Sequence, residues 1–210
     1  MITIIDYGMG NLQSLANAFQ FLGEEVKITD NPKEIEKAQK LVFPGVGDFG
    51  KAIKNLKKKK IDLPIRNSIQ KGTPFLGICL GLQLLFEKSE EAPNDKGLNI
   101  FKGKILRFKN VKTPQIGWNQ INILKKTKIF KEIENNSFVY FMHSFYVEPL
   151  DKKIIVARTN YGKGFCSAIE QKNVFGVQFH PEKSGKTGLK ILRNFITAKP
   201  ICRVKPVIEL

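Results

Sequence analysis

Cys79 stands at the centre of residues 77–81, a Gly-Ile-Cys-Leu-Gly segment with a glycine two positions away on each side. The short apolar run 73–76 precedes this segment, and a second apolar run, 82–86, follows it. A nucleophile between a strand and a helix, with small neighbours, is typical of a nucleophile elbow, because a strained turn needs residues without bulk. Such a turn places the sulfur at a helix N-terminus, where the helix dipole favours the thiolate. The alternative is that Cys79 is a small buried hydrophobic residue, as most free cysteines are.

A histidine and a glutamate near the end of the chain could complete a catalytic set with Cys79. The apolar run 174–179 predicts a strand that ends at His180, because Pro181 cannot continue it. Glu182 could then accept a hydrogen bond from one ring nitrogen of His180 while the other nitrogen faces the thiol. A His-Pro-Glu segment alone is common on protein surfaces, but with a glycine-bracketed cysteine it predicts a Cys–His–Glu triad. This chemistry uses no metal and no cofactor.

The segment Gly45, Val46 and Gly47 follows a short apolar strand predicted at residues 41–43. An attack by sulfur on a carbonyl carbon needs backbone N–H donors aimed at the developing oxyanion. Glycines at the end of a strand allow the backbone to turn its amides toward such a site. We therefore expect one donor from this segment and a second from the N–H of Leu80, which follows the nucleophile. An ordinary strand-to-helix turn at this segment is the alternative.

Alternating strands and helices are predicted for the first half of the chain. Strands are expected at residues 2–5, 26–28, 41–43 and 73–76. Helices are expected at residues 12–22, 33–38, 49–56 and 61–70. From residue 98 onward the pattern predicts short strands at residues 104–108, 120–124, 139–142, 154–158 and 165–169, with a final helix at 187–195.

This order predicts a single-domain α/β fold, because alternating elements give right-handed crossovers and a parallel sheet with helices on both faces. The expected architecture is flavodoxin-like, with a mostly parallel central sheet, flanking helices and additional antiparallel strands in the C-terminal half. The three chemical segments each follow a predicted strand, at the sheet edge where such folds place their sites. We expect one domain over residues 1–198 and a basic tail at residues 199–210, either disordered or packed on the surface.

Composition agrees with one enzyme domain in the cytoplasm. The chain has 210 residues, of which 42% are hydrophobic, enough for a sizeable core. No stretch has the length of a membrane span, and residues 1–5 lead into a strand rather than a signal peptide, so we expect no membrane association. The cysteines Cys79, Cys166 and Cys202 are odd in number and lack metal-ligand spacing, which favours a reducing compartment.

The net charge of +16 raises nucleic-acid binding as a rival function. The lysines at residues 57–60, however, end a helical pattern, where they form a solvated face and complement the helix C-terminus. No recognised nucleic-acid-binding motif is present. We therefore expect no nucleic-acid partner, and we assign some of the basic residues to docking a protein partner or meeting a phosphorylated substrate.

The motifs together resemble those of the class I, or triad, glutamine amidotransferases. The class motifs are residues 44–47 (PGVG), 77–83 (GICLGLQ) and 179–182 (FHPE). Within the class, residues 2–196 are most similar to the glutaminase subunits of imidazole glycerol phosphate synthase. The segments that carry this narrower resemblance are residues 5–11 (IDYGMGN), 114–119 (PQIGWN), 140–145 (YFMHSF) and 183–184 (KS).

The resemblance implies an activity and its residues. Cys79 would attack the carboxamide of glutamine, His180 would act as the base, and Glu182 would orient the imidazole. By the same resemblance, Gln83 and the backbone of Ser144 and Phe145 would hold the amino-acid end of the substrate. The second histidine of the chain, His143, is expected to be structural, because the triad already has its base.

The resemblance also implies a partner, a cyclase subunit with a (βα)8-barrel fold that forms a heterodimer with this chain. The barrel would receive ammonia through an internal channel and make imidazole glycerol phosphate and aminoimidazole carboxamide ribotide in histidine biosynthesis. Trp118, Asn119 and Lys183 would face this partner, with an exposed tryptophan as an interface anchor. A tryptophan in the core is the alternative.

Two other functions fit the same motifs. One is a paralogous glutaminase subunit that supplies ammonia to a different acceptor, such as a nucleotide-linked or surface-polysaccharide sugar. The other is a non-catalytic binding or regulatory homologue, which the intact Cys79, His180 and Glu182 argue against.

Overall fold

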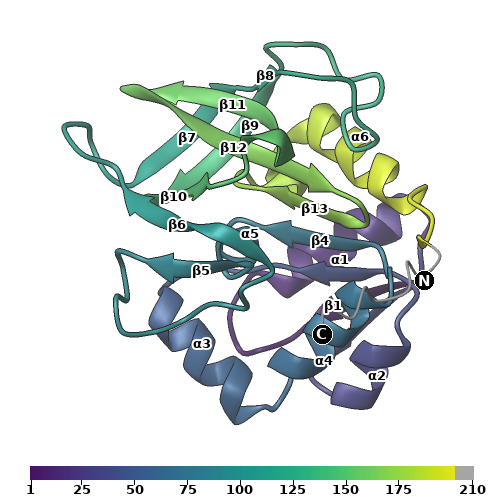
Figure 1. The fold of residues 1–210 in the computed structure, drawn as a ribbon. Coiled ribbons are helices and arrows are strands. Elements are labelled where there is room, and N and C mark those ends of the chain that lie inside the picture. The colour runs from purple at the N-terminus through teal and green to yellow at the C-terminus, as the bar shows by residue number, and fades with distance from the viewer. Residues whose placement is uncertain (202–210) are drawn as a thin grey trace.

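An eight-stranded sheet runs through the centre of the computed structural model, which describes residues 1–201 (Figure 1). Its strand order is β2-β1-β3-β4-β13-β12-β11-β8. The first five strands in this order are parallel, and they are β2 (Val26–Thr29), β1 (Ile2–Ile5), β3 (Leu41–Phe43), β4 (Phe75–Ile78) and β13 (Val174–Val177). The remaining strands are antiparallel, and they are β12 (Lys163–Gln171), β11 (Ile155–Tyr161) and β8 (Asn122–Ile123). The predicted α/β fold with a mostly parallel sheet is therefore confirmed.

Helices cover both faces of this sheet (Figure 1). They are α1 (Leu12–Phe21), α2 (Pro32–Lys37), α3 (Phe49–Lys58), α4 (Asp62–Gln70), α5 (Leu80–Gln83) and α6 (Gly185–Ile196). Two 3-10 turns, η1 (Lys152–Ile154) and η2 (Pro181–Lys183), complete the helical elements. Local chemistry fixes the helix ends: the Asn11 side chain accepts a hydrogen bond from the N–H of Ser14 at the start of α1, and the Asp48 side chain accepts from Lys51 at the start of α3.

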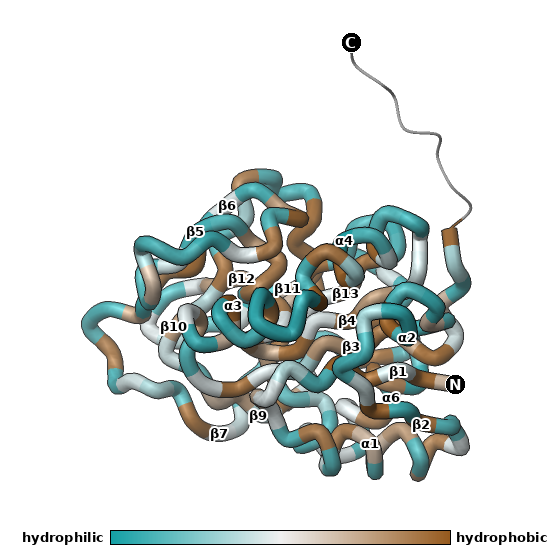
Figure 2. Tube along the Cα trace, turned by 90° about the horizontal axis from the view of Figure 1, so that it is seen from below, coloured by the Kyte–Doolittle hydropathy of each residue, from teal (hydrophilic) through white to brown (hydrophobic). Residues whose placement is uncertain are grey.

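The core has two parts because successive side chains of a strand point to opposite faces. In β4, Leu76 and Ile78 pack with α1 and α6, whereas Phe75 packs on the other face with α2, α3 and α4. In Figure 2 the hydrophobic residues follow β1, β4 and β13 through the interior. The strands that carry the chemical segments are thus buried on both faces, as parallel strands in such folds are.

Two smaller sheets pack beside the antiparallel half. One contains β10 (Phe145–Pro149), β6 (Phe101–Arg107) and β5 (Phe86–Ser89), and the other is a ribbon of β7 (Gln115–Gln120) and β9 (Phe138–His143). The sequence pattern did not predict β5, β7 or β10. The apolar run 82–86 continues the helix only to Gln83, because the carbonyls of Leu84 and Leu85 accept hydrogen bonds from residues 98–101 and Phe86 enters β5.

Only the start of the expected basic tail can be described, since residues 202–210, which include Cys202, lie outside the described part of the chain. At its start the N–H of Ile201 donates to the carbonyl of Gly72, 3.1 Å away. Among residues 1–201, no helix has both the length and the apolar character needed to cross a membrane.

Helix α5 and strand β3 approach each other more closely than side chains would allow. A Cβ on Gly81 would lie 1.7 Å from the carbonyl oxygen of Phe43, a backbone atom that cannot rotate away. Glycine at position 81 therefore permits the contact that holds the end of β3 against the turn after β4.

We expect Gly81→Ala to lower the free energy of unfolding by about 1–3 kcal/mol or more, because the added methyl group must displace backbone. Denaturant unfolding measures the change. Gly164→Ala in β12 is the matched control, since a Cβ there meets no atom within 4 Å, and it should change stability by less than about 0.5 kcal/mol. Equal stability of the two variants would contradict the rigid contact.

Candidate active site

Cys79 occupies a strained turn between β4 and α5. Its φ of +54° and ψ of −110° are unusual for a residue with a side chain. The flanking glycines meet across this turn, because a Cβ on Gly77 would lie 2.9 Å from the carbonyl oxygen of Gly81. The turn has the geometry expected of a nucleophile elbow, although α5 is only one turn long.

The Cys79 sulfur is buried between two polar groups. The side chain is free of any disulfide and 5% exposed. Its Sγ accepts a hydrogen bond from Nε2 of Gln178 at 3.5 Å and donates to the carbonyl of Met142 at 3.8 Å. The sulfur therefore has a donor on one side and an acceptor on the other.

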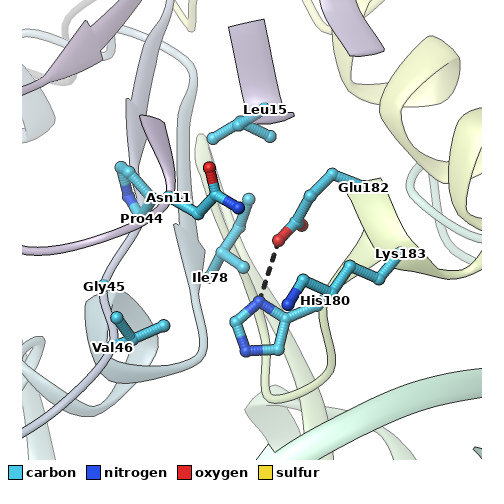
Figure 3. Close-up of a pocket in the computed structure, with 9 residues that line it drawn as sticks. All are labelled: Asn11, Leu15, Pro44, Gly45, Val46, Ile78, His180, Glu182 and Lys183. Atoms are coloured by element: carbon cyan, nitrogen blue, oxygen red, sulfur yellow. Dashed lines mark hydrogen bonds and ion pairs between the residues drawn. The ribbon is translucent and has the colours of Figure 1, made fainter. Parts of the chain in front are cut away.

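His180 and Glu182 form a buried pair beside this turn. Nδ1 of His180 lies 2.9 Å from Oε1 of Glu182, and their side chains are 3% and 5% exposed. Figure 3 shows the other ring nitrogen turned away from Glu182. That nitrogen, Nε2, is buried and has no hydrogen-bond partner within residues 1–201, so it can receive a proton from a group that enters the site.

The strand before this pair is shorter than predicted. Strand β13 ends at Val177 rather than at His180. The N–H of Gln178 still donates to the carbonyl of Ser167 in the neighbouring strand β12. The N–H of His180 instead donates to the carbonyl of Tyr140 in β9, so the chain has left the central sheet by this residue. The hydroxyl of Ser184 fixes the turn by donating to the carbonyl of His180 at 2.7 Å.

Opposing effects set the pKa of His180. Burial alone would lower it, but the negative charge of a Cys79 thiolate and the Glu182 carboxylate together outweigh burial and raise the pKa to about 10. A protonated His180 is thus stabilised whenever its neighbours are negatively charged. This is the electrostatic condition for a thiolate–imidazolium pair.

The segment of residues 45–47 lies against the nucleophile, but in an orientation that differs from the expected donor arrangement. The carbonyl oxygen of Gly45 accepts a hydrogen bond from the N–H of Leu80 at 3.3 Å. The N–H of Leu80, which was expected to stabilise the oxyanion, is therefore occupied by the Gly45 carbonyl. Residues 45–47 were expected to provide the second donor but here provide an acceptor. The structure brings the two segments together, but in this conformation the N–H of Leu80 is not free to stabilise an oxyanion.

A cavity of about 280 Å³ opens in front of the sulfur. Its lining residues are Val46, Gly47, Cys79, Leu80, Gln83, Glu91, Pro114, Met142, His143, Ser144 and Phe145. The structure thus gathers the predicted nucleophile, the residues expected to hold substrate, and two members of the 45–47 segment around one space. Gln83 contributes to the wall by donating from Nε2 to the carbonyl of Phe145 at 2.9 Å.

Glu91 lines this cavity, although the sequence pattern did not predict it as a site residue. Its carboxylate accepts from the N–H of Phe49 at the start of α3, and burial raises its pKa above the usual range. Glu91 lies in the charged connection of residues 89–97, beside Glu90 and near Asp95, and no spacing in the sequence distinguishes it from them.

A second, smaller cavity of about 20 Å³ lies behind the His180–Glu182 pair (Figure 3). Its lining residues are Asn11, Leu15, Pro44, Gly45, Val46, Ile78, His180, Glu182 and Lys183. Val46 lines this space and the larger cavity, so the 45–47 segment borders both.

Of the expected partner residues, Lys183 on η2 lines this second cavity, whereas Trp118 and Asn119 lie on β7 of the β7–β9 ribbon. Trp118 is 55% exposed, so the alternative of a core tryptophan is wrong. Its ring meets Tyr140 edge-on at 6.0 Å, and the Lys183 ammonium lies 5.8 Å above the same Tyr140 ring. Asn119 is held by a hydrogen bond to the carbonyl of Asn160.

The fold is α/β, and a cysteine on a strained turn lies beside a buried histidine–glutamate pair at the carboxyl ends of its parallel strands. The family description "Glutamine amidotransferase class-I" matches residues 3–198. The imidazole glycerol phosphate synthase subunit HisH of Pyrococcus furiosus is 51% identical over 195 residues, 92% of this chain and 97% of that protein. The subunit of the same name from Methanocaldococcus jannaschii is 49% identical over 201 residues, 93% of this chain and 98% of that protein. The chain therefore belongs to the class I glutamine amidotransferases and, within them, to the HisH family.

Solved structures of lower identity share the fold. The structure of PurLQS from Thermotoga maritima contains a chain that superposes with a TM-score of 0.75 at 19% identity, covering 93% of this chain and 96% of that one. A structure described as a glutamine amidotransferase gives a TM-score of 0.74 at 18% identity, with coverages of 93% and 97%.

His143 stabilises the wall of the larger cavity and does not face the sulfur as a base. Its Nδ1 lies 2.7 Å from the carbonyl oxygen of Phe145, and its Nε2 lies 3.1 Å from Oε1 of Gln115. Burial lowers the pKa of His143 to about 4, although the bond to Phe145 opposes this shift. The imidazole is therefore neutral at neutral pH.

The lowered pKa of His143 predicts a loss of stability in acid. In the unfolded chain His143 binds a proton below its ordinary pKa of 6.5, whereas in the folded protein it binds one only near pH 4. Because the unfolded state binds more protons between these two values, the free energy of unfolding falls as the pH is lowered from 6.5 to about 4. The loss should reach on the order of 2–3 kcal/mol near pH 4. Urea unfolding of the wild type and His143→Gln between pH 7 and pH 4 tests this, because the variant should lose less. Parallel pH profiles would contradict the assignment.

Proposed function

We propose that this chain is the glutaminase subunit of an imidazole glycerol phosphate synthase and hydrolyses glutamine through a thioester at Cys79. The observation that carries the proposal is the strained Cys79 at the floor of the 280 Å³ cavity, next to the buried His180–Glu182 pair. Relatives at 44–51% identity named as HisH subunits support histidine biosynthesis over a sugar acceptor.

The first half of the reaction forms the thioester and releases ammonia. The Cys79 sulfur attacks the side-chain carbonyl carbon of glutamine while Nε2 of His180 holds the thiol proton. The N–H of Leu80 and an amide of residues 45–47 stabilise the tetrahedral oxyanion. The carbon–nitrogen bond then breaks, and His180 passes the proton to the departing ammonia.

The second half returns the enzyme to its starting state. His180 removes a proton from water, and the resulting hydroxide attacks the thioester carbon. The carbon–sulfur bond breaks, glutamate leaves, and the sulfur regains its proton from His180. Glu182 keeps Nδ1 protonated throughout, so that Nε2 carries every transfer.

The larger cavity suits an amino acid whose side chain points at the sulfur. Glu91 offers a carboxylate for the α-ammonium group of the substrate, and the backbone at Ser144 and Phe145 offers polar groups to its other end. The Gln83 amide fixes that wall through its bond to the Phe145 carbonyl. We assign the substrate-binding role to these residues together.

The exposed face of the β7–β9 ribbon supports a partner surface. Ile116, Trp118 and Phe138 are 62%, 55% and 54% exposed, and the cross-strand register places them on one face. We propose that a (βα)8-barrel cyclase covers this face as a heterodimer, with Trp118 and Lys183 in contact. Asn119 lies on the opposite face of β7, where its side chain donates to the carbonyl of Asn160, so it supports the ribbon from behind. The small cavity beside Lys183 then lies on the path of ammonia toward the cyclase. The free Cys79 and Cys166 agree with a cytoplasmic location.

Cys79→Ala should lower glutamine-dependent turnover of the complex with the cyclase by at least about 1,000-fold, because the nucleophile is lost. The same complex should still make imidazole glycerol phosphate from high ammonium salt at alkaline pH, where free ammonia replaces the missing product. Substantial glutamate release by pure Cys79→Ala protein would refute the nucleophile. Loss of both activities in an assembled complex would show that this chain takes part in the cyclase chemistry.

The bond between the Gly45 carbonyl and the Leu80 N–H gives the site a resting state. Leu80 cannot stabilise an oxyanion while that carbonyl occupies it. Turning the Gly45–Val46 peptide over would free Leu80 and direct the Val46 N–H into the site. We propose that docking of the cyclase, with its acceptor substrate bound, shifts the population toward this second orientation.

The glutaminase rate should therefore be low in the free chain and rise by at least about 100-fold only with both the cyclase and its acceptor ligand present. Steady-state glutamate release by the free chain, the complex and the liganded complex measures this coupling. A free chain that hydrolyses glutamine at the full rate of the liganded complex would exclude the switch.

A further inference from the structure

Gln178 connects the sulfur of Cys79 to the wall of the larger cavity. Its side chain is completely buried, two residues before His180 in the turn that leaves β13. Nε2 of Gln178 donates to Sγ of Cys79 at 3.5 Å, and Oε1 accepts from Nε2 of Gln83 at 3.1 Å. The two ends of one amide thus contact the nucleophile and a residue of the substrate wall.

The hydrogen-bond network fixes which end of this amide faces the sulfur. The carbonyl of Phe145 can only accept, so the Gln83 group 2.9 Å from it must be the amide nitrogen. That same nitrogen faces Gln178, which must therefore present its oxygen there. The nitrogen of Gln178 then points at Cys79, and no other orientation satisfies all three groups.

An N–H donor at this position favours negative charge on the sulfur. Hydrogen bonds to an ionised partner are roughly twice as strong as neutral ones, and burial strengthens them further. A second polar neighbour of the sulfur, the carbonyl of Met142, accepts from the thiol and disfavours a thiolate. Of these two hydrogen-bond partners, only Gln178 stabilises the thiolate form of Cys79.

We propose that Gln178 is a catalytic residue that donates a hydrogen bond to the Cys79 thiolate and thereby sets the reactivity of the nucleophile. Gln83 holds the amide of Gln178 in the required orientation from the substrate side. The inference deepens the proposed function and rests on it only in taking Cys79 as the nucleophile.

The test compares Gln178→Met, which removes both polar ends at similar volume, with Ser167→Ala. Ser167 lies on β12 beside Gln178, and its buried hydroxyl has no partner within residues 1–201, so the control changes a neighbouring buried group without touching the sulfur. Alkylation of Cys79 by iodoacetamide in the isolated chain, followed by mass spectrometry at neutral pH, reports reactivity without glutamine. The kcat and KM of glutamine hydrolysis are measured in the complex with the cyclase.

We expect Gln178→Met to slow alkylation and to lower kcat, each by about 10- to 100-fold, as for loss of a hydrogen bond to a charged group. Ser167→Ala should match the wild type. Raising the pH should restore alkylation of Gln178→Met toward the wild-type rate, because hydroxide then supplies the thiolate. A purely structural role for Gln178 would not give this recovery.

Unchanged alkylation of Gln178→Met, with only a raised KM, would overturn the proposal and leave Gln178 as a support for Gln83. If Gln178→Met does not fold, the nearly isosteric Gln178→Glu is tested instead at alkaline pH. Its ionised carboxylate repels the thiolate, so Cys79 in this variant should be alkylated more slowly than in the wild type. An equal rate there would also overturn the proposal. Fast alkylation of a wild-type complex that releases no glutamate would instead refute the proposed function.

Discussion

The close contact between the end of β3 and the first turn of α5 determines the rest of the site. The Phe43 carbonyl lies where a side chain of residue 81 would begin, so the two backbones touch without intervening atoms. This contact brings the peptide after Gly45 within hydrogen-bond distance of Leu80 and keeps Cys79 in a backbone conformation that few residues adopt. The neighbouring strands of the sheet and the helices packed on both of its faces hold the turn in this strained conformation.

Sheet order then explains why segments far apart in the sequence meet. Strands β3, β4 and β13 are neighbours and parallel, so their carboxyl ends lie along one edge. Gly45 follows β3, Cys79 follows β4, and His180 follows β13 by three residues. The two residues between Val177 and His180 matter, because they place Gln178 against the sulfur and let His180 reach β9.

The parallel half of the fold was predictable because its strands are short apolar runs and its helices have clear periodicity and capping residues. The proximity of Cys79 to the His180–Glu182 pair was predictable for a similar reason, since glycines around Cys79 and proline after His180 mark backbone constraints. Strands β5, β7 and β10 were not, because their conformation depends on long-range pairing, as when residues 98–101 end α5. Glu91 and Gln178 were not predictable, because their surroundings depend on contacts with Phe49 and Cys79, which are 42 and 99 positions away in the chain.

The two histidines show how surroundings, and not residue type, assign chemistry in this site. His180 lies beside groups that carry negative charge, which raise its pKa against the effect of burial. His143 lies between a carbonyl and an amide, so burial dominates and its pKa falls. A positive charge is therefore favoured on His180, next to Glu182, whereas the lining of the larger cavity carries no charged side chain apart from Glu91. A wall of that kind can receive a zwitterionic amino acid without competing with the sulfur for the proton of His180.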